Sequence, residues 1–146
     1  MDIIKSFYLY PFKSEVLFFL SMEKFMNVLI VDDEPDLVET LTLMLKNHGF
    51  RVTSASNGIE GLEKAKTELP DIIILDLMMP EMDGFEMCKQ LKSNEETSGI
   101  PIIILTAKSD TESRFKTFKY KADYYIVKPF HLPNLVSKIN ELLFPK

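Results

Sequence analysis

The sequence predicts an α/β fold in which five parallel strands form a doubly wound sheet with helices on both faces. Three segments that are aliphatic except for Asn27 have the length of strands and are typical of strands covered on both sides. Segments with apolar residues at spacings of three and four, the period of an amphipathic helix, alternate with the strand segments. This unit of strand and helix occurs five times, and right-handed crossovers turn such a chain into a single parallel sheet.

The strands are predicted from their composition. Residues 27–31, 72–75 and 102–105 are continuous aliphatic segments, so they are expected at the centre of the sheet. Residues 51–54 and 124–127 are more mixed in polarity and are expected at or near its edges. Five such units fit the flavodoxin-like strand order 2-1-3-4-5, a (βα)5 arrangement, in which a site lies beyond the carboxyl ends of the strands.

Five helices are predicted from their apolar stripes, each of which is expected to face the sheet. In chain order the stripes contain Leu37, Val38, Leu41, Met44 and Leu45; Ile59, Leu62, Ala65 and Leu69; Phe85, Cys88 and Leu91; Phe115 and Phe118; and Leu135, Val136, Ile139, Leu142 and Leu143. Phe115 and Phe118 are therefore interpreted as core residues rather than as ligand contacts. Gly49 follows the first stripe and is expected to end that helix in the left-handed conformation.

The composition favours one globular domain and gives no sign of an affinity for nucleic acid. The chain has 146 residues, 46% of them hydrophobic and 27% charged, which is close to the average for globular proteins. The formal net charge is -5, so no overall positive field attracts phosphate backbones. The single cysteine, Cys88, cannot form an internal disulfide and is expected to be a buried small residue in a reducing, cytoplasmic protein.

The first 25 residues differ from the rest, and we divide the chain into an extension (1–25) and a domain (26–146). The extension holds seven aromatic residues, and its longest apolar run, residues 16–20, is too short for a membrane span or a signal peptide. Two interpretations stay open. A start codon assigned too far upstream is one, since Met22 and Met26 precede the first strand; aromatics that cover a partner surface or pack on the domain are the other.

The residues that follow the predicted strands form a single group of polar side chains. Asp32 and Asp33 follow the first strand, Asp76 the third, Thr106 the fourth and Lys128 the fifth. Three carboxylates held close together repel one another unless a cation lies among them, and Mg²⁺ accepts such ligands. A lysine ammonium and a threonine hydroxyl suit phosphoryl oxygens. The group therefore predicts phosphoryl transfer onto or off a carboxylate.

Four motifs in this order resemble those of the receiver domain of two-component response regulators. They are LIVDDEP (29–35), DIIILDLMMPEMDG (71–84), PIIILTA (101–107) and YYIVKPF (124–130), and the resemblance covers the chain from residue 27 to its end. It implies that Asp76 is the phosphoacceptor and attacks a phosphohistidine on a sensor histidine kinase or a histidine phosphotransfer protein. It also implies a self-catalysed phosphoacceptor, not an enzyme acting on other substrates.

The resemblance also implies the magnesium ligands. Asp33 and Asp76 would bind Mg²⁺ together with the main-chain carbonyl of Met78, and Asp32 would act largely through bound water. Glu34, by contrast, is expected to be a solvent-facing charge.

The same resemblance assigns the remaining positions of the site. Thr106 and Lys128 would hold the phosphoryl group, Tyr125 would be the aromatic switch, and the Lys128–Pro129 bond would be cis. Met78 and Lys108 occupy the variable positions that tune the phosphoryl lifetime in this family. Neither residue offers a carboxylate or an amide that could orient water, so we expect a fairly long-lived phosphorylated state.

One position departs from the usual family pattern. Lys121 stands where the family usually has glycine at the end of the fourth helix. The left-handed conformation expected there costs a lysine about 1 kcal/mol.

We interpret the chain as a stand-alone receiver that signals through the face formed by its fourth helix, fifth strand and fifth helix. Its expected output is contact with a downstream protein or a phosphorelay, without direct binding to nucleic acid and without a membrane span, as a monomer or a phosphorylation-dependent dimer. Two alternatives stay open. A Mg²⁺-dependent phosphohydrolase would usually have a second acid where this chain has Met78, and a phosphorylation-independent interaction module would not need Asp33, Asp76, Thr106 and Lys128.

Overall fold

The computed structural model describes residues 25–146, which contain a five-stranded parallel sheet in the order β2-β1-β3-β4-β5. The strands are β1 (Asn27–Val31), β2 (Arg51–Ala55), β3 (Ile72–Leu75), β4 (Ile102–Thr106) and β5 (Tyr124–Val127). The predicted fold class and strand order are confirmed. The two strands of mixed polarity, β2 and β5, are the edges, and the three aliphatic strands are central.

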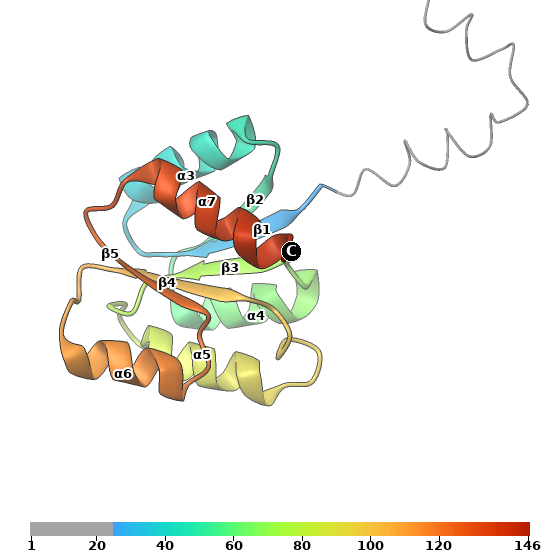
Figure 1. The fold of residues 1–146 in the computed structure, drawn as a ribbon. Helices are drawn as coiled ribbons and strands as arrows, with labels where there is room; N and C mark the ends of the chain where they lie inside the picture. Colours follow the sequence, from blue (N-terminus) through green and yellow to red (C-terminus); the bar gives the residue numbers. More distant parts are fainter. Residues whose placement is uncertain (1–24) are drawn as a thin grey trace, which may run out of the picture.

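Five helices cover the two faces of the sheet: α3 (Pro35–Asn47), α4 (Gly58–Glu68), α5 (Gly84–Ser93), α6 (Thr111–Lys119) and α7 (Leu132–Leu143). Helices α3 and α7 lie on one face, and α4, α5 and α6 lie on the other (Figure 1). This division follows from right-handed crossovers on either side of the switch point between β1 and β3.

The core consists of two apolar layers that share the central strands. The apolar side chains of β1, β3 and β4 alternate between the layers, and most of them are fully buried. One layer includes Leu41, Leu45 and Ile139 from α3 and α7, and the other includes Leu62 and Leu91 from α4 and α5. A strand buried on both faces has no polar side to present, which explains the continuous aliphatic sequences.

The prediction that Phe115 and Phe118 belong to the core is wrong. Their side chains are 70% and 71% exposed, while Ser113 and Thr117 are the buried residues of α6. Thr117 donates its hydroxyl proton to the main-chain carbonyl of Ser113 at 2.9 Å, so this polar face satisfies itself inside the protein. Two aromatics three residues apart share one side of a helix, but the spacing alone does not say which side faces the sheet.

The predicted stripe of α4 is wrong at both ends. Ile59 and Leu69 are 52% and 48% exposed, and the buried face is centred on Gly61, Leu62 and Ala65. Gly61 allows α4 to approach the sheet closely, because a Cβ there would lie 2.8 Å from the Cγ atoms of Val31. Small residues set the side of closest approach, and a pattern based on large apolar residues does not detect them.

The ends of two helices behave as predicted. Gly49 follows α3 with φ +87°, and Lys121 lies after α6 with φ +61°.

Cys88 is fully buried, as predicted, and its thiol donates to the main-chain carbonyl of Tyr120 at 3.2 Å.

Two further predictions concern a membrane span and the extension, residues 1–25. Across the part of the chain that the structure describes, no helix has the length and apolar character needed to cross a bilayer. The predicted extension, residues 1–25, lies outside the described residues except for Phe25, so both interpretations of it stay predictions.

Candidate functional site

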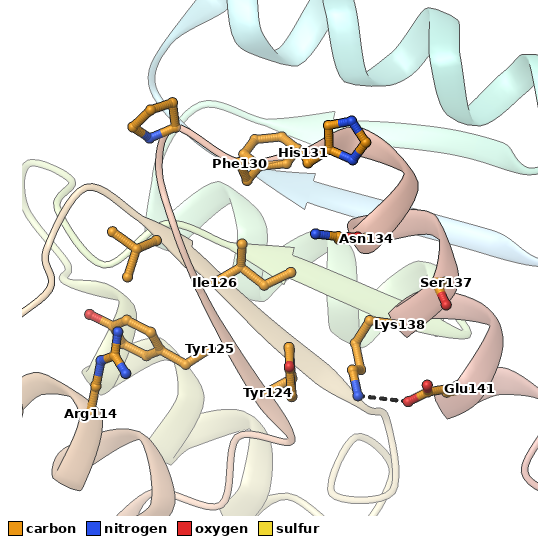
Figure 2. Close-up of a pocket in the computed structure, with 12 residues that line it drawn as sticks. Arg114, Tyr124, Tyr125, Ile126, Phe130, His131, Asn134, Ser137, Lys138 and Glu141 are labelled. Carbon is orange, nitrogen blue, oxygen red and sulfur yellow. Dashed lines mark hydrogen bonds and ion pairs between the residues drawn. The ribbon is translucent and has the colours of Figure 1, made fainter.

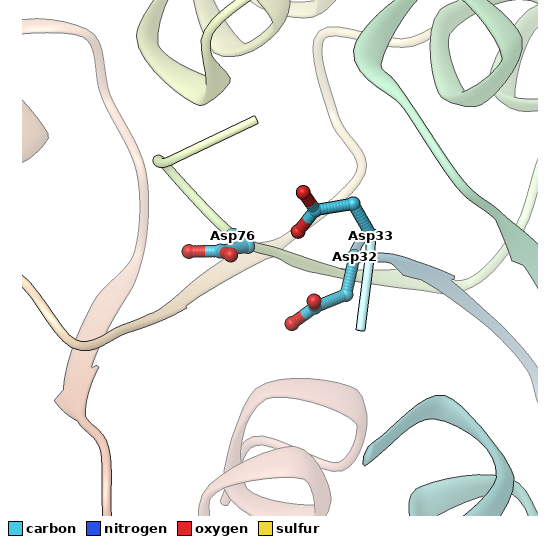
Figure 3. A group of neighbouring side chains, drawn as sticks. All are labelled: Asp32, Asp33 and Asp76. Carbon is cyan, nitrogen blue, oxygen red and sulfur yellow. The ribbon is translucent and has the colours of Figure 1, made fainter. Parts of the chain in front are cut away.

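Three carboxylates meet at the carboxyl ends of β1 and β3. Asp32, Asp33 and Asp76 each offer an oxygen atom, and these three atoms all lie within 4.8 Å of one another (Figure 3). Main-chain hydrogen bonds continue the sheet past the strand ends and fix these residues: the N–H of Asp76 donates to the carbonyl of Val31 at 2.9 Å, and the N–H of Asp32 donates to that of Ala55 at 3.1 Å. The juxtaposition predicted from the strand ends is therefore present.

The three acids differ in their environment. Asp32 and Asp76 are buried, with 4% and 5% of their surface exposed, whereas Asp33 is exposed. Burial raises the pKa of Asp32, although hydrogen bonds from Lys128 and from the main-chain N–H of Glu34 oppose that rise. The rise persists because the effect of burial outweighs that of these hydrogen bonds.

Lys128 links the acids to the end of β5. Its Nζ lies 2.8 Å from Oδ2 of Asp32, 2.9 Å from Oε1 of Glu34 and 3.6 Å from Oδ2 of Asp76. Burial alone would lower the pKa of Lys128, but the hydrogen bonds to Asp32 and Glu34 and the negative charges of Asp32 and Asp76 together outweigh burial and raise it. The ammonium therefore stays charged at neutral pH. A positive charge is what a group needs to attract phosphoryl oxygens.

Thr106 closes the site on the β4 side. It is fully buried, and its Oγ1 accepts the main-chain N–H of Lys108 at 3.3 Å. Its main-chain carbonyl accepts the N–H of Lys128 at 2.8 Å, so the ends of β4 and β5 are held together. On the opposite side the N–H of Met78 donates to Oδ1 of Asp76 at 3.3 Å. Met78 and Lys108 have exposed side chains.

Tyr125 lies on β5 on the side that faces α6, and it lines a hollow of about 560 Å³ between α6 and α7 (Figure 2). Its hydroxyl donates to the main-chain carbonyl of Lys108, and the Cζ atom of Arg114 is 5.7 Å from its ring centroid. Burial and the charge of Asp110 raise the pKa of Tyr125. The ring is half-buried against the apolar layer beneath α4 and α5, and its hydroxyl contacts the loop that carries Lys108. The Lys128–Pro129 bond is cis.

The residues of the rim fit a hard divalent cation. Carboxylate oxygens are the ligands that Mg²⁺ prefers, and it requires only one or two of them beside water and phosphate oxygens. Asp32, Asp33 and Asp76 supply more carboxylate charge than Lys128 balances. A cation would relieve this excess, so the donor set supports the predicted magnesium site.

Two residues of the site were not predicted from the sequence. Glu34, expected to be a solvent-facing charge, has a 61% exposed side chain but pairs with Lys128. Gly84 packs closely against the main chain of Asp76, because a Cβ at Gly84 would be 2.5 Å from the main-chain oxygen of Asp76. The Glu34 contact joins residues 94 positions apart, so no local pattern reveals it. An Asp-Gly pair is typical of a turn and a helix cap, and Asp83 caps α5 by accepting the main-chain N–H of Glu86.

Comparison with known proteins gives a consistent result. The model of the family described as response regulator receiver domain matches residues 28–140. Over 117 residues the chain is 43% identical to the response regulator ArlR of Staphylococcus saprophyticus and 42% identical to that of Staphylococcus aureus. Each match covers 80% of this chain and 52% of the relative. The chain thus spans about half the length of the curated relatives that it matches.

Solved structures resemble the whole described domain. The chemotaxis protein CheY4 of Vibrio cholerae superposes with a TM-score of 0.77 at 31% identity, covering 82% of this chain and 99% of that chain. A CheY-like response regulator receiver domain protein from Methanospirillum hungatei superposes with a TM-score of 0.78 at 28% identity, covering 82% and 94% of the two chains.

Proposed function

The chain belongs to the family of response regulator receiver domains, and from that premise we propose that Asp76 is its phosphoacceptor. The phosphoryl group would come from a phosphohistidine on a sensor histidine kinase or a histidine phosphotransfer protein. The observation that carries the proposal is the position of Asp76: a buried carboxylate beside two further acids, with the Lys128 ammonium 3.6 Å from its Oδ2.

Phosphoryl transfer needs little covalent assistance from the protein, because positioning and charge neutralisation supply most of the rate. Asp76 would attack phosphorus in line, and the histidine nitrogen would leave with the electrons of the P–N bond. Asp33, Asp76 and the main-chain carbonyl of Met78 would hold Mg²⁺, with Asp32 acting through bound water. When bound, the ion supplies the positive charge that offsets the phosphoryl oxygens.

Lys128 and Thr106 would hold the phosphoryl group after transfer. Phosphorylation adds about -1.5 to -2 charges and three acceptor oxygens, so the ammonium and the hydroxyl gain new partners. Movement of Thr106 would pull the loop that carries Lys108, whose carbonyl accepts the hydroxyl of Tyr125. Tyr125 would then turn inward, and the signal would reach α6, β5 and α7 as a shift in population.

Two exposed residues at the rim would set the lifetime of the phosphoryl group. Met78 and Lys108 offer no carboxylate or amide to orient an attacking water, so we propose slow autodephosphorylation. Replacing Met78 by Asn would add such a group and accelerate the loss of phosphate. A rate that rises little in this variant would count against the proposal.

The output would be contact with another protein, either as a monomer or as a phosphorylation-dependent dimer. Because the chain spans only about half of its curated relatives, the activity of those whole proteins does not transfer to it.

The intact mass of the protein after incubation with acetyl phosphate tests the proposal. We expect a single phosphoryl adduct that requires Mg²⁺ and is absent from the Asp76→Ala variant. Rapid release of inorganic phosphate without an adduct would instead support the phosphohydrolase. Absence of both would support the phosphorylation-independent module.

A further inference from the structure

Glu34 makes a contact that the roles proposed above do not use. It is the residue before α3 and the N-cap of that helix, yet its side chain makes no capping hydrogen bond. Ser, Thr, Asp and Asn side chains commonly cap their own helix at this position, and the longer glutamate is not among these preferred caps. The Glu34 carboxylate instead lies 2.9 Å from Nζ of Lys128, 94 residues further along the chain.

This contact closes a ring of hydrogen bonds around Asp32. The main-chain N–H of Glu34 donates to Oδ1 of Asp32 at 2.9 Å, and Nζ of Lys128 donates to Oδ2 at 2.8 Å. The same Nζ donates to Oε1 of Glu34, and this third hydrogen bond closes the ring at Glu34. The backbone of the β1–α3 loop and the lysine at the end of β5 are thus tied together at both ends of one buried carboxylate.

The ring fixes how many donors Lys128 has left. A lysine ammonium has three N–H donors, and Asp32 and Glu34 accept two of them. Oδ2 of Asp76 lies 3.6 Å from Nζ, beyond hydrogen-bond distance. The third donor is therefore available for a phosphoryl oxygen, and the oxygen of Asp76 that faces the ammonium is ion-paired with it but accepts no hydrogen bond from it.

We propose that Glu34 is a positioning residue for Lys128: it holds the ammonium on Asp32 and short of a hydrogen bond with Asp76. The inference rests on the proposed function of Asp76 as phosphoacceptor. Without Glu34 the flexible four-carbon stem of lysine can bring Nζ onto Oδ2 of Asp76. That oxygen would then be a poorer nucleophile, and the donor meant for the phosphoryl group would be occupied.

Three variants separate position from charge. Glu34→Ala removes the contact, and Glu34→Asp keeps the charge but shortens the side chain by one methylene. Glu39→Ala is the matched control, because Glu39 is an exposed acid on α3 that forms no ion pair with Lys128 among the described residues. We expect Glu34→Ala to slow phosphorylation by acetyl phosphate at saturating Mg²⁺ by about two- to fivefold, the range of a partly exposed ion pair. Glu34→Asp should be slowed as well, and Glu39→Ala should not.

A double-mutant cycle with Lys128→Ala tests whether Glu34 acts through the lysine. In the Lys128→Ala background, Glu34→Ala should cause no further slowing. An equal slowing in both backgrounds, or a faster reaction in Glu34→Ala, would overturn the proposal.

A second readout does not depend on phosphorylation. Hydrogen bonds slow the exchange of ammonium protons, so the Lys128 side chain should give a ¹H–¹⁵N signal in the wild-type protein. The signal should keep its position in Glu39→Ala and shift in Glu34→Ala, where the ammonium exchanges its hydrogen bond with Glu34 for one with Asp76. An unchanged Lys128 signal in Glu34→Ala would contradict the proposal. If the wild-type protein accepts no phosphoryl group while the signal behaves as expected, the proposed function fails and the link between Glu34 and Lys128 stands.

Discussion

Replacing Gly84 by alanine should damage the loop behind Asp76. A Cβ at Gly84 would lie 2.5 Å from the main-chain oxygen of Asp76 and 2.8 Å from Cα of Leu77. Both neighbours are backbone atoms, so no side-chain rotation relieves the contact. Overpacking of this kind costs about 3 kcal/mol at the upper end of its usual range. The helix preference of alanine at the start of α5 returns about 0.5–1 kcal/mol.

The net loss is therefore about 2 kcal/mol of unfolding free energy, which lowers the melting temperature by about 8 °C for a domain of this size. Gly99→Ala is the matched control, because a Cβ at Gly99 meets no atom within 4 Å and its backbone is not left-handed. That variant should be unchanged or more stable by about 0.4–1 kcal/mol. Urea unfolding of the wild-type protein and both variants measures the difference. Equal stability of the two variants would refute the reasoning.

Three further predictions concern stability and reactivity. Replacing both Phe115 and Phe118 by serine should change the free energy of unfolding by only about 0.5 kcal/mol per site, because both rings are exposed. Urea unfolding measures the change. A loss of about 3 kcal/mol or more per site would indicate that the two rings are core residues. Lys121→Gly should stabilise the protein by about 0.5 kcal/mol. The free-energy cost of holding a lysine at positive φ is removed, and this cost is larger than the stabilisation of the unfolded chain by the more flexible glycine. A lower urea midpoint would contradict this. Burial raises the pKa of Cys88 to about 11, so its thiol should react with an aromatic disulfide reagent at pH 8 only after unfolding, and rapid reaction of the native protein would be the opposite result.

The sheet could be predicted from the sequence because its central strands are buried on both faces. In β1, β3 and β4 this burial leaves an aliphatic segment with no polar alternation, and the edges β2 and β5 are recognisable by their mixed polarity. The buried side of α6 could not be predicted in this way. Ser113 and Thr117 are buried with their hydroxyls satisfied locally, whereas the two large aromatics face outward.

The arrangement of the site was predictable to the extent that it follows from topology. Parallel strands end at one rim, so residues directly after β1 and β3 must lie together, and Asp32, Asp33 and Asp76 do. The pairing of Glu34 with Lys128 depends instead on how two loops meet in space. No spacing within either segment indicates that contact.

The most direct test of the central claim is to locate the phosphoryl group on the chain. After incubation with acetyl phosphate and Mg²⁺, sodium borohydride reduces the acyl phosphate of an aspartate to the alcohol of homoserine with release of phosphate, and peptide mass spectrometry identifies the altered residue. We predict homoserine at position 76 and unaltered aspartate at positions 32 and 33. Homoserine at position 32 or 33, or no altered aspartate after a phosphoryl adduct has formed, would contradict the assignment of Asp76.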